Sequence, residues 1–130
     1  MQATPFQIVG CVFCAEGAAE RIDEFATRAR RERAVVTAKN SRQATFVRFG
    51  ASDARLIALA CRAARDTRGA ALRFGFACST SNRGAPGGDD LRVSSRSIAQ
   101  ATDLAGAARD GEVLLSAQLA SLLADAVAEL

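Results

Sequence analysis

The sequence has 130 residues, a formal net charge of +3 and 49% hydrophobic residues. These values predict a single soluble domain that spans residues 1–130. The absence of histidine excludes a histidine general base, a Ser-His-Asp triad and histidine metal ligands. With neither tryptophan nor tyrosine, aromatic platforms for nucleic acid are scarce. Arginines supply nearly all the positive charge and alternate with acids, which indicates solvated faces rather than a nucleic-acid-binding patch.

The hydrophobic segments carry no targeting signal. No basic segment precedes the first apolar stretch, which argues against a signal peptide. No run of about 18 uncharged apolar residues is present, so no membrane span is expected. The four cysteines lack secretory features around them, which indicates free thiols and a cytoplasmic location.

The first half of the chain predicts a strand, a helix and a hairpin. Residues 6–15 are apolar and rich in β-branched and aromatic residues, as in a buried strand. Residues 18–31 have apolar side chains at helical spacing. The stretches 33–38 and 44–49 predict the two strands of a hairpin that turns at Asn40 and Ser41.

The second half alternates helices and strands. Ser52 or Asp53 is the expected N-cap of a helix that continues to about residue 67. Apolar and polar residues alternate from Leu72 to Cys78, which is typical of a half-buried strand. The remaining predicted elements are a polar turn-forming loop at 79–90, a helix at 94–109, a strand at 112–115 and a final helix capped by Ser116.

The order β-α-β-β-α-β-α-β-α predicts an α/β (α+β) fold. Its first six elements spell βαββαβ, the pattern of a ferredoxin-like sheet. We expect an antiparallel or mixed sheet with the helices packed mainly on one face. Because this fold carries many functions, it does not by itself identify one.

Three stretches resemble the catalytic domain of class III adenylate and guanylate cyclases. Residues 95–116 contain a small-residue helix followed by Ala-x-x-Gly-Glu-Val-x-x-Ser. Residues 43–64 contain Phe-Val-Arg-Phe-Gly-Ala-Ser-Asp-Ala, which leads into an Ala/Leu helix. Residues 72–77, Leu-Arg-Phe-Gly-Phe-Ala, are similar to a glycine-containing strand of the family. The resemblance implies a shortened nucleotidyl-cyclase-like fold, with only one helix between the first two strands.

At the family's functional positions, the resemblance implies the loss of catalysis. Two aspartates there bind divalent ions that neutralise phosphate charge. Their positions fall on Ala15, with Glu16 one step off register, and on the pair Arg42-Gln43. The asparagine and the arginine of the family's helix fall on Ala99 and Asp103. We therefore expect no catalytic residue, no bound metal, no cofactor and no enzyme activity.

Lys39 is the single candidate for a ligand contact. It matches the lysine that contacts adenine in adenylate-specific members, so the resemblance implies a nucleotide contact at this residue. The alternative is a lysine at the hairpin edge that discourages pairing with another strand.

The cysteines invite a second interpretation. Cys11 and Cys14 form a CxxC, a spacing found in redox and zinc sites. Within a strand, however, positions i and i+3 face opposite sides, and the first thiol of a redox-active CxxC needs a helix N-terminus to lower its pKa. Buried structural thiols are the favoured interpretation, with a metal or redox role as the alternative.

Four further features have a structural and a functional interpretation, and the structural one is favoured for each. They are a glycine-rich loop at 84–88 (mobile loop or phosphate cradle), Asp89-Asp90 (helix-dipole partners or cation site), the arginines of 28–33 (solvated helix end or phosphate contact) and the last helix (packed on the sheet or partner-binding).

The sequence thus predicts a catalytically inactive cyclase-homology domain that acts in signalling as a regulatory or dimerisation module. The expected partner is a second copy of the chain, or another cyclase-like or signalling domain. The alternative is a sensor domain that binds a nucleotide or another small molecule without a metal, in a pocket that includes Lys39.

Overall fold

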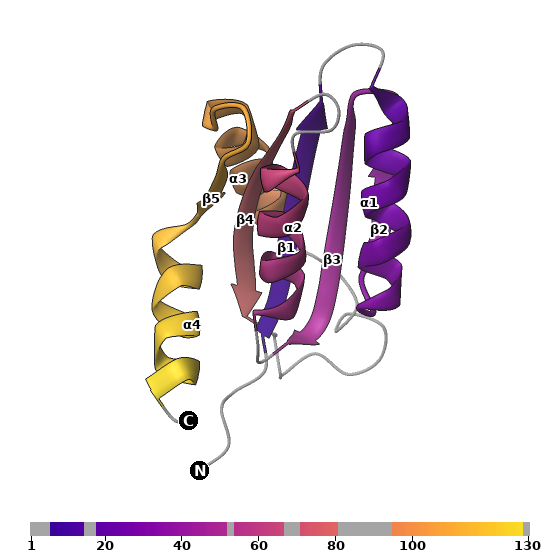
Figure 1. Ribbon diagram of the computed structural model, residues 1–130. Helices are drawn as coiled ribbons and strands as arrows, with labels where there is room; N and C mark the ends of the chain where they lie inside the picture. Colours follow the sequence, from indigo (N-terminus) through magenta and orange to yellow (C-terminus); the bar gives the residue numbers. More distant parts are fainter. Residues whose placement is uncertain (1–5, 15–17, 52–53, 67–70, 81–94, 129–130) are drawn as a thin grey trace.

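The strands and helices follow one another along the chain in the predicted order (Figure 1). The computed structural model describes residues 6–14, 18–51, 54–66, 71–80 and 95–128. Its elements are β1 (Phe6–Cys14), α1 (Ala19–Arg31), β2 (Val35–Lys39), β3 (Gln43–Ala51), α2 (Arg55–Arg65), β4 (Leu72–Thr80), α3 (Ser95–Ala107), β5 (Val113–Leu115) and α4 (Ala117–Ala128).

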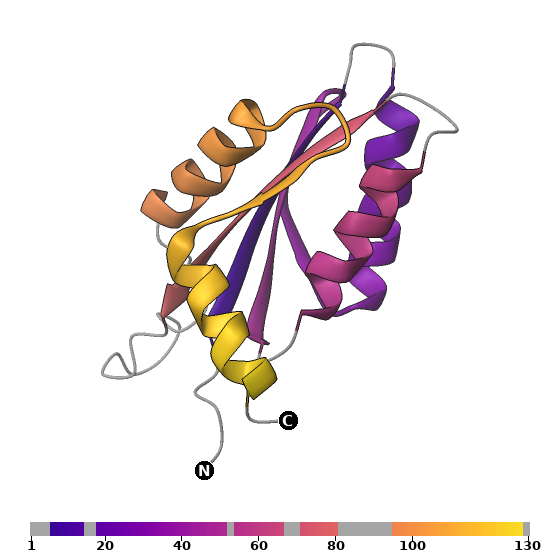
Figure 2. The ribbon, with the colours of Figure 1, turned by 60° about the vertical axis from the view of Figure 1, so that its left-hand side comes forward.

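The strands form one mixed sheet in the order β2-β3-β1-β4-β5. The pairs β2–β3, β3–β1 and β1–β4 are antiparallel, and β5 runs parallel to β4. The first four strands have the order that a βαββαβ ferredoxin-like chain produces, so the predicted fold is confirmed. Figure 2 shows α1 and α2 on one side of this sheet and α3 on the other.

The starts of one strand and one helix differ from the prediction for identifiable reasons. The strand expected from Arg33 begins at Val35, because Arg33 has a left-handed φ of 69° that directs the chain out of α1. The cap expected at Ser52 or Asp53 is instead Ala54, which makes no side-chain hydrogen bond. That helix starts late because β3 continues to Ala51, two residues beyond the predicted end.

The C-terminal end of α2 is fixed by a residue of α1. The guanidinium of Arg21 donates to the backbone oxygens of Ala63 and Asp66 at 3.2 and 3.3 Å, and to the Asp66 carboxylate at 3.3 Å. These bonds satisfy carbonyl groups that a helix end leaves without partners. As a result α2 ends at Arg65, somewhat before the predicted residue 67.

Phenylalanines form the core on one face of the sheet, here called the aromatic face. Phe46, Phe74 and Phe76 project from the sheet, and Phe25 of α1 packs between them. The ring centroids of Phe25 and Phe74 are 4.8 Å apart, and those of Phe46 and Phe76 are 5.7 Å apart. Edge-to-face contacts at these distances are favourable beyond the apolar area that they bury.

The opposite face, here called the α3 face, is built from small side chains. Val9, Cys11, Val47 and Ala77 of the sheet pack against Ala101 and Ala105 of α3. Gly75 permits this close approach, because a Cβ atom there would lie 2.2 Å from the Ala101 oxygen. The glycine is therefore required for α3 to lie directly on β4.

The final helix packs where the sequence predicts. The Ser116 hydroxyl accepts a hydrogen bond from the Leu119 amide at 3.1 Å, which confirms the predicted cap. Leu119 is fully buried in the core of the aromatic face. No helix within the described ranges is both long and apolar enough to cross a membrane.

The predicted loop at 79–90 is described in part. Its first two residues continue β4, which extends to Thr80 instead of ending at Cys78. The rest of that loop, including the glycine-rich stretch 84–88 and Asp89-Asp90, lies outside the described residues.

Candidate functional site

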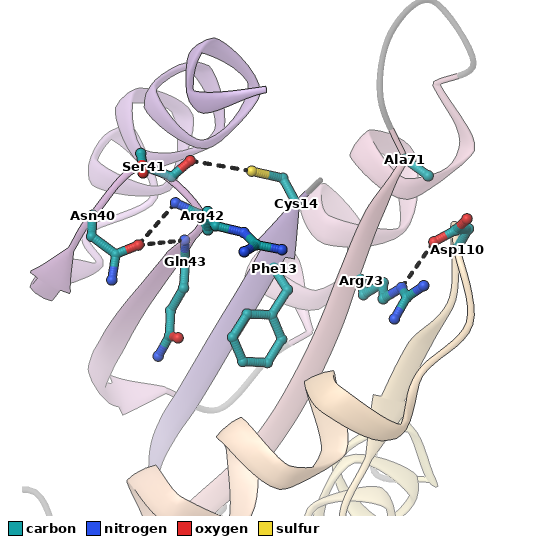
Figure 3. Close-up of a pocket in the computed structure, with 9 residues that line it drawn as sticks. All are labelled: Phe13, Cys14, Asn40, Ser41, Arg42, Gln43, Ala71, Arg73 and Asp110. Atoms are coloured by element: carbon teal, nitrogen blue, oxygen red, sulfur yellow. Dashed lines mark hydrogen bonds and ion pairs between the residues drawn. The ribbon is translucent and has the colours of Figure 1, made fainter. Parts of the chain in front are cut away.

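A groove of about 750 Å³ opens at the end of the sheet beside the β2–β3 hairpin (Figure 3). Four segments that are distant in the sequence meet there: the end of β1, the hairpin, the start of β4 and the turn between α3 and β5. The lining residues, which define the hairpin groove, are Phe13, Cys14, Asn40, Ser41, Arg42, Gln43, Ala71, Arg73 and Asp110.

A row of three side chains crosses the groove on the α3 face. Strand register places Phe13 opposite Gln43 of β3 on one side and opposite Arg73 of β4 on the other. Residues opposite one another in paired strands project from the same face of the sheet. With neighbouring strands about 4.8 Å apart, Gln43 and Arg73 stand about 10 Å apart on either side of Phe13. Figure 3 shows the Phe13 ring between these two side chains.

The hairpin turn is held rigidly by Asn40. Its side-chain oxygen accepts hydrogen bonds from the amides of Arg42 and Gln43 at 2.8 and 3.0 Å. The Arg42 carbonyl in turn accepts a bond from the Cys14 amide at 2.9 Å, which attaches the turn to the end of β1. Asparagine is suited to this position because its side chain can bond to the backbone two residues ahead. The turn therefore fixes the backbone that carries Arg42.

Positive charge dominates the described lining of the groove. Arg42 is exposed at the hairpin, and Arg73 stands on β4 across the end of β1. Arg73 Nε donates to Asp110 Oδ1 at 2.8 Å, and Asp110 is the only carboxylate among the described lining residues. Side-chain exposures of 43% and 69% make this a solvated ion pair, so its contribution to stability is small.

Cys14 closes the inner wall of the groove. Its thiol lies 3.6 Å from the Ser41 carbonyl oxygen, to which it donates a weak hydrogen bond. Burial raises the pKa of the Cys14 thiol above its usual value, and the nearby Arg42 charge partly opposes that rise. The thiol therefore stays protonated and contributes a small apolar wall.

This set of side chains fits an anion better than a divalent cation. Divalent ions prefer several carboxylate or carbonyl oxygens, whereas two guanidinium groups repel a cation. Arginine also presents a planar fork of donors that matches phosphate oxygens. Across the described part of the chain, no group of three or more Cys, Asp or Glu side chains could hold a metal ion.

The positions selected by the cyclase resemblance fall into two groups. Gln43 and Arg42 line the hairpin groove beside the end of β1, while Ala15 and Glu16, next along the chain, lie outside the described residues. The end of the first strand and the hairpin, which the resemblance pairs, are thus brought together.

The other two selected positions lie elsewhere. Ala99 and Asp103 are exposed on α3 and are absent from the lining of the groove. The structure therefore does not unite all four selected positions in one site of a single chain.

Lys39 lies at the end of β2, next to the hairpin groove but not among the residues that line it. Its ammonium group forms an ion pair with the Asp23 carboxylate of α1, on the aromatic side of the sheet. A nucleotide contact at Lys39 stays a prediction, and it would require a change of partner for this side chain.

Three of the four cysteines are buried, as expected of structural thiols, whereas Cys61 on α2 is half-buried. All four are free, and Cys11 and Cys14 belong to the cores on opposite faces, as their spacing predicts. Burial raises the pKa of Cys11 to about 11 and also raises that of Cys78. At Cys11, Cys14 and Cys78, burial outweighs the hydrogen bond or the Arg42 charge that favours the thiolate, so these thiols ionise less readily than an ordinary cysteine.

The arginines at the end of α1 have solvated surroundings. Arg28 pairs with Glu24 one turn earlier at 2.9 Å, and about half of each side chain is exposed. This agrees with the prediction of a solvated helix end.

Sequence reasoning did not select Phe13, Arg73 or Asp110 as site residues. By sequence, Phe13 belongs to an apolar strand, Arg73 is a polar position of an alternating strand, and Asp110 directly follows the helix predicted at 94–109. Only the strand register and the docking of the α3–β5 turn bring the three together. The alternation from Leu72 to Cys78 showed which face Arg73 occupies, but it did not show what lies opposite.

Comparison with known proteins identifies the fold. No protein-family model matches the chain, and no curated protein matches it. Among solved structures, the chain is similar to the crystal structure of the adenylyl cyclase CyaB from P. aeruginosa. The match covers 96% of this chain and 84% of that one, with a TM-score of 0.61 and 17% sequence identity. At this identity the likeness establishes a cyclase-like fold.

This finding contradicts the prediction that the chain is not an enzyme, because the structure that covers nearly all of it is an adenylyl cyclase. The prediction depended on residue identities at four positions that were aligned by resemblance alone. One of them, Ala15, lies outside the described residues together with its acidic neighbour Glu16. The identities at these positions are therefore not a sufficient basis for excluding catalysis.

Proposed function

We propose that this chain is a diverged class III cyclase-homology domain that acts in cytoplasmic signalling by binding a nucleotide phosphate in the hairpin groove. The observation that carries the proposal is the pair of guanidinium groups, Arg42 and Arg73, facing one groove at the end of the sheet. In this proposal the arginines supply the positive charge that a metal ion supplies in a cyclase.

The dimensions and chemistry of the groove favour a nucleotide over a small inorganic anion. A volume of about 750 Å³ is in the range of pockets that hold drug-sized ligands. Phe13 supplies an apolar surface, and the Gln43 amide beside it has both a donor and an acceptor for the edge of a base. The phosphates then contact Arg42 and Arg73.

A thermal-shift experiment tests this function. The purified domain is heated with ATP, GTP, cyclic nucleotides and pyrophosphate, in EDTA and in Mg²⁺ or Mn²⁺. We expect a higher melting temperature with a nucleoside polyphosphate in EDTA, because a ligand that binds only the folded state stabilises it. Arg42→Gln and Arg73→Gln should each reduce the shift, whereas Arg62→Gln, an exposed arginine of α2, should not.

Two results would reject or change the proposal. A shift that requires the divalent ion, or one that Arg42→Gln leaves intact, would reject metal-independent binding in the hairpin groove. The same incubations are assayed for cyclic nucleotide. Its formation would make the groove, or a site near it, an active site.

A second candidate function, dimerisation, is favoured by a separate observation on β2. This strand lies at an edge of the sheet, and Val35 on it is 51% exposed. An apolar side chain on an edge strand favours pairing with another strand. The proposed partner is a second copy of the chain or another cyclase-like domain.

Sedimentation velocity tests the dimer. A charge on the edge strand opposes pairing, so Val35→Lys should shift a dimer towards the monomer. Ala58→Lys adds the same charge to an exposed position of α2 and should leave the dimer intact. A monomeric wild type, or a dimer that Val35→Lys does not weaken, would reject this edge as the interface.

A further inference from the structure

Asp110 forms an ion pair with Arg73, one of the two cationic side chains that line the hairpin groove. Arg73 Nε donates to Asp110 Oδ1 at 2.8 Å, on the side of the groove opposite the hairpin (Figure 3). Asp110 itself lines the groove. A carboxylate in this position presents a negative charge and acceptor oxygens to Arg73, as a phosphate would.

The backbone around Asp110 is held independently of this ion pair. The Gly111 amide donates to the Leu72 carbonyl at 2.9 Å, and the Phe74 amide donates to the Glu112 carbonyl at 3.0 Å. These bonds dock the α3–β5 turn against β4 on both sides of Arg73. Loss of the ion pair therefore releases the Asp110 side chain while the turn stays in place.

The pair is weak enough for a ligand to break. Its side chains are 43% and 69% exposed, and solvated ion pairs contribute little because water and salt screen them. Among the described lining residues, the one carboxylate, Asp110, lies against Arg73 and not against Arg42.

We propose that Asp110 is an internal competitor for the phosphate ligand: it occupies Arg73 in the unliganded groove and is displaced when the ligand binds. This rests on the proposed function, and it adds a regulatory role for a residue that the cyclase resemblance does not select. Arg42 provides the first contact for an incoming anion. Arg73 becomes available only when the anion replaces Asp110, which favours ligands with two or more phosphate groups over single anions.

Calorimetric titration of pyrophosphate into the domain in EDTA tests whether Asp110 competes with the ligand for Arg73. Asp110→Asn keeps the shape of the side chain and removes its charge. It should bind pyrophosphate about threefold to fivefold more tightly than the wild type, the range expected for loss of one solvated ion pair. Glu20→Gln removes one exposed carboxylate from α1, on the aromatic side of the sheet, and should bind like the wild type. Asp110→Ser serves as a second charge-removing variant.

A double variant separates competition from general electrostatics. If Asp110 acts by occupying Arg73, then Asp110→Asn should give no gain in an Arg73→Gln background. An equal gain in both backgrounds would mean that Asp110 acts only through its long-range charge, and would overturn the proposal. The ¹⁵Nε resonance of Arg73 should also shift on titration of the wild type, because its hydrogen-bond acceptor changes from carboxylate to phosphate.

The experiment gives different results if the role of Asp110 is wrong and if the phosphate site itself is wrong. If the wild type binds pyrophosphate and Arg42→Gln weakens binding, but Asp110→Asn has no effect, the competitor is rejected and the phosphate site stands. If neither the wild type nor Asp110→Asn binds, the phosphate site itself is rejected, and the competitor with it.

Discussion

The two faces of the sheet are packed in different ways: one with large aromatic side chains and the other mainly with small ones. The aromatic face fills its space with large rings from Phe25, Phe46, Phe74 and Phe76, which contact one another over several elements. The α3 face brings backbone close to backbone through small side chains and Gly75, and at one end it opens into the hairpin groove. The difference indicates that the aromatic face supplies most of the stability, whereas the α3 face positions the groove.

The largest expected effect comes from a ring of the aromatic face. Phe74 is fully buried, and its substitution by alanine leaves a cavity among the other rings. Phe74→Ala should lower the free energy of unfolding by about 4 kcal/mol. Chemical denaturation measures this loss. Phe13→Ala, on the groove side and only half-buried, is the matched comparison and should cost less than half as much. Equal losses would contradict the division of roles between the faces.

A glycine on the α3 face should give the next largest effect. Alanine at position 75 would place its Cβ 2.2 Å from the Ala101 oxygen and 2.3 Å from the Ala105 nitrogen, both backbone atoms of α3. Because α3 would have to move, Gly75→Ala should cost about 3 kcal/mol in the free energy of unfolding.

Gly106→Ala on the same helix is the control for the Gly75 variant. A Cβ there would lie 3.8 Å from the Phe13 ring, an ordinary contact. Alanine in a helix should stabilise the domain by about 0.5 kcal/mol. A destabilisation of similar size at both glycines would show that close approach of α3 is not what requires Gly75.

A buried thiol on the α3 face should make stability depend on alkaline pH. Burial raises the pKa of Cys11 from 9.0 to about 11, an effect that a hydrogen bond with Thr102 partly opposes. Between these values the unfolded thiol has ionised and the folded thiol has not, so the folded state binds more protons. The free energy of unfolding should therefore fall by about 2 kcal/mol as pH rises from 9 to 11.

The Cys11 effect is measured as a difference between proteins. The wild type and Cys11→Ala are denatured at a series of pH values. The difference between their free energies of unfolding cancels the contributions that both share, including those of Cys14 and Cys78. Parallel curves for the two proteins would show that the Cys11 thiol ionises as easily in the folded state as in the unfolded chain.

Much of the fold could be predicted because the local patterns were clear. The alternation at Leu72, Phe74 and Phe76 identified β4 and the face that it buries. The βαββαβ order then fixed the arrangement of the first four strands. Both patterns depend on periodicities that the side chains impose on short segments.

The hairpin groove could be predicted only in part. The resemblance pointed to the end of β1 and to Gln43, and these do meet there. The row from Gln43 through Phe13 to Arg73 depends on strand register, which the nearly continuous apolar run of β1 leaves unspecified. Asp110 reaches the groove only through the docking of the turn after α3.

The most direct test of the phosphate site is calorimetric titration of ATP into the wild-type domain in EDTA, compared with the double variant Arg42→Gln/Arg73→Gln and with Arg62→Gln. Charge-assisted hydrogen bonds to two guanidinium groups predict metal-independent binding by the wild type and about a hundredfold loss in the double variant. Arg62→Gln should bind ATP as tightly as the wild type. Binding that appears only with Mg²⁺, or that the double variant retains in full, would contradict an arginine-based phosphate site in the hairpin groove.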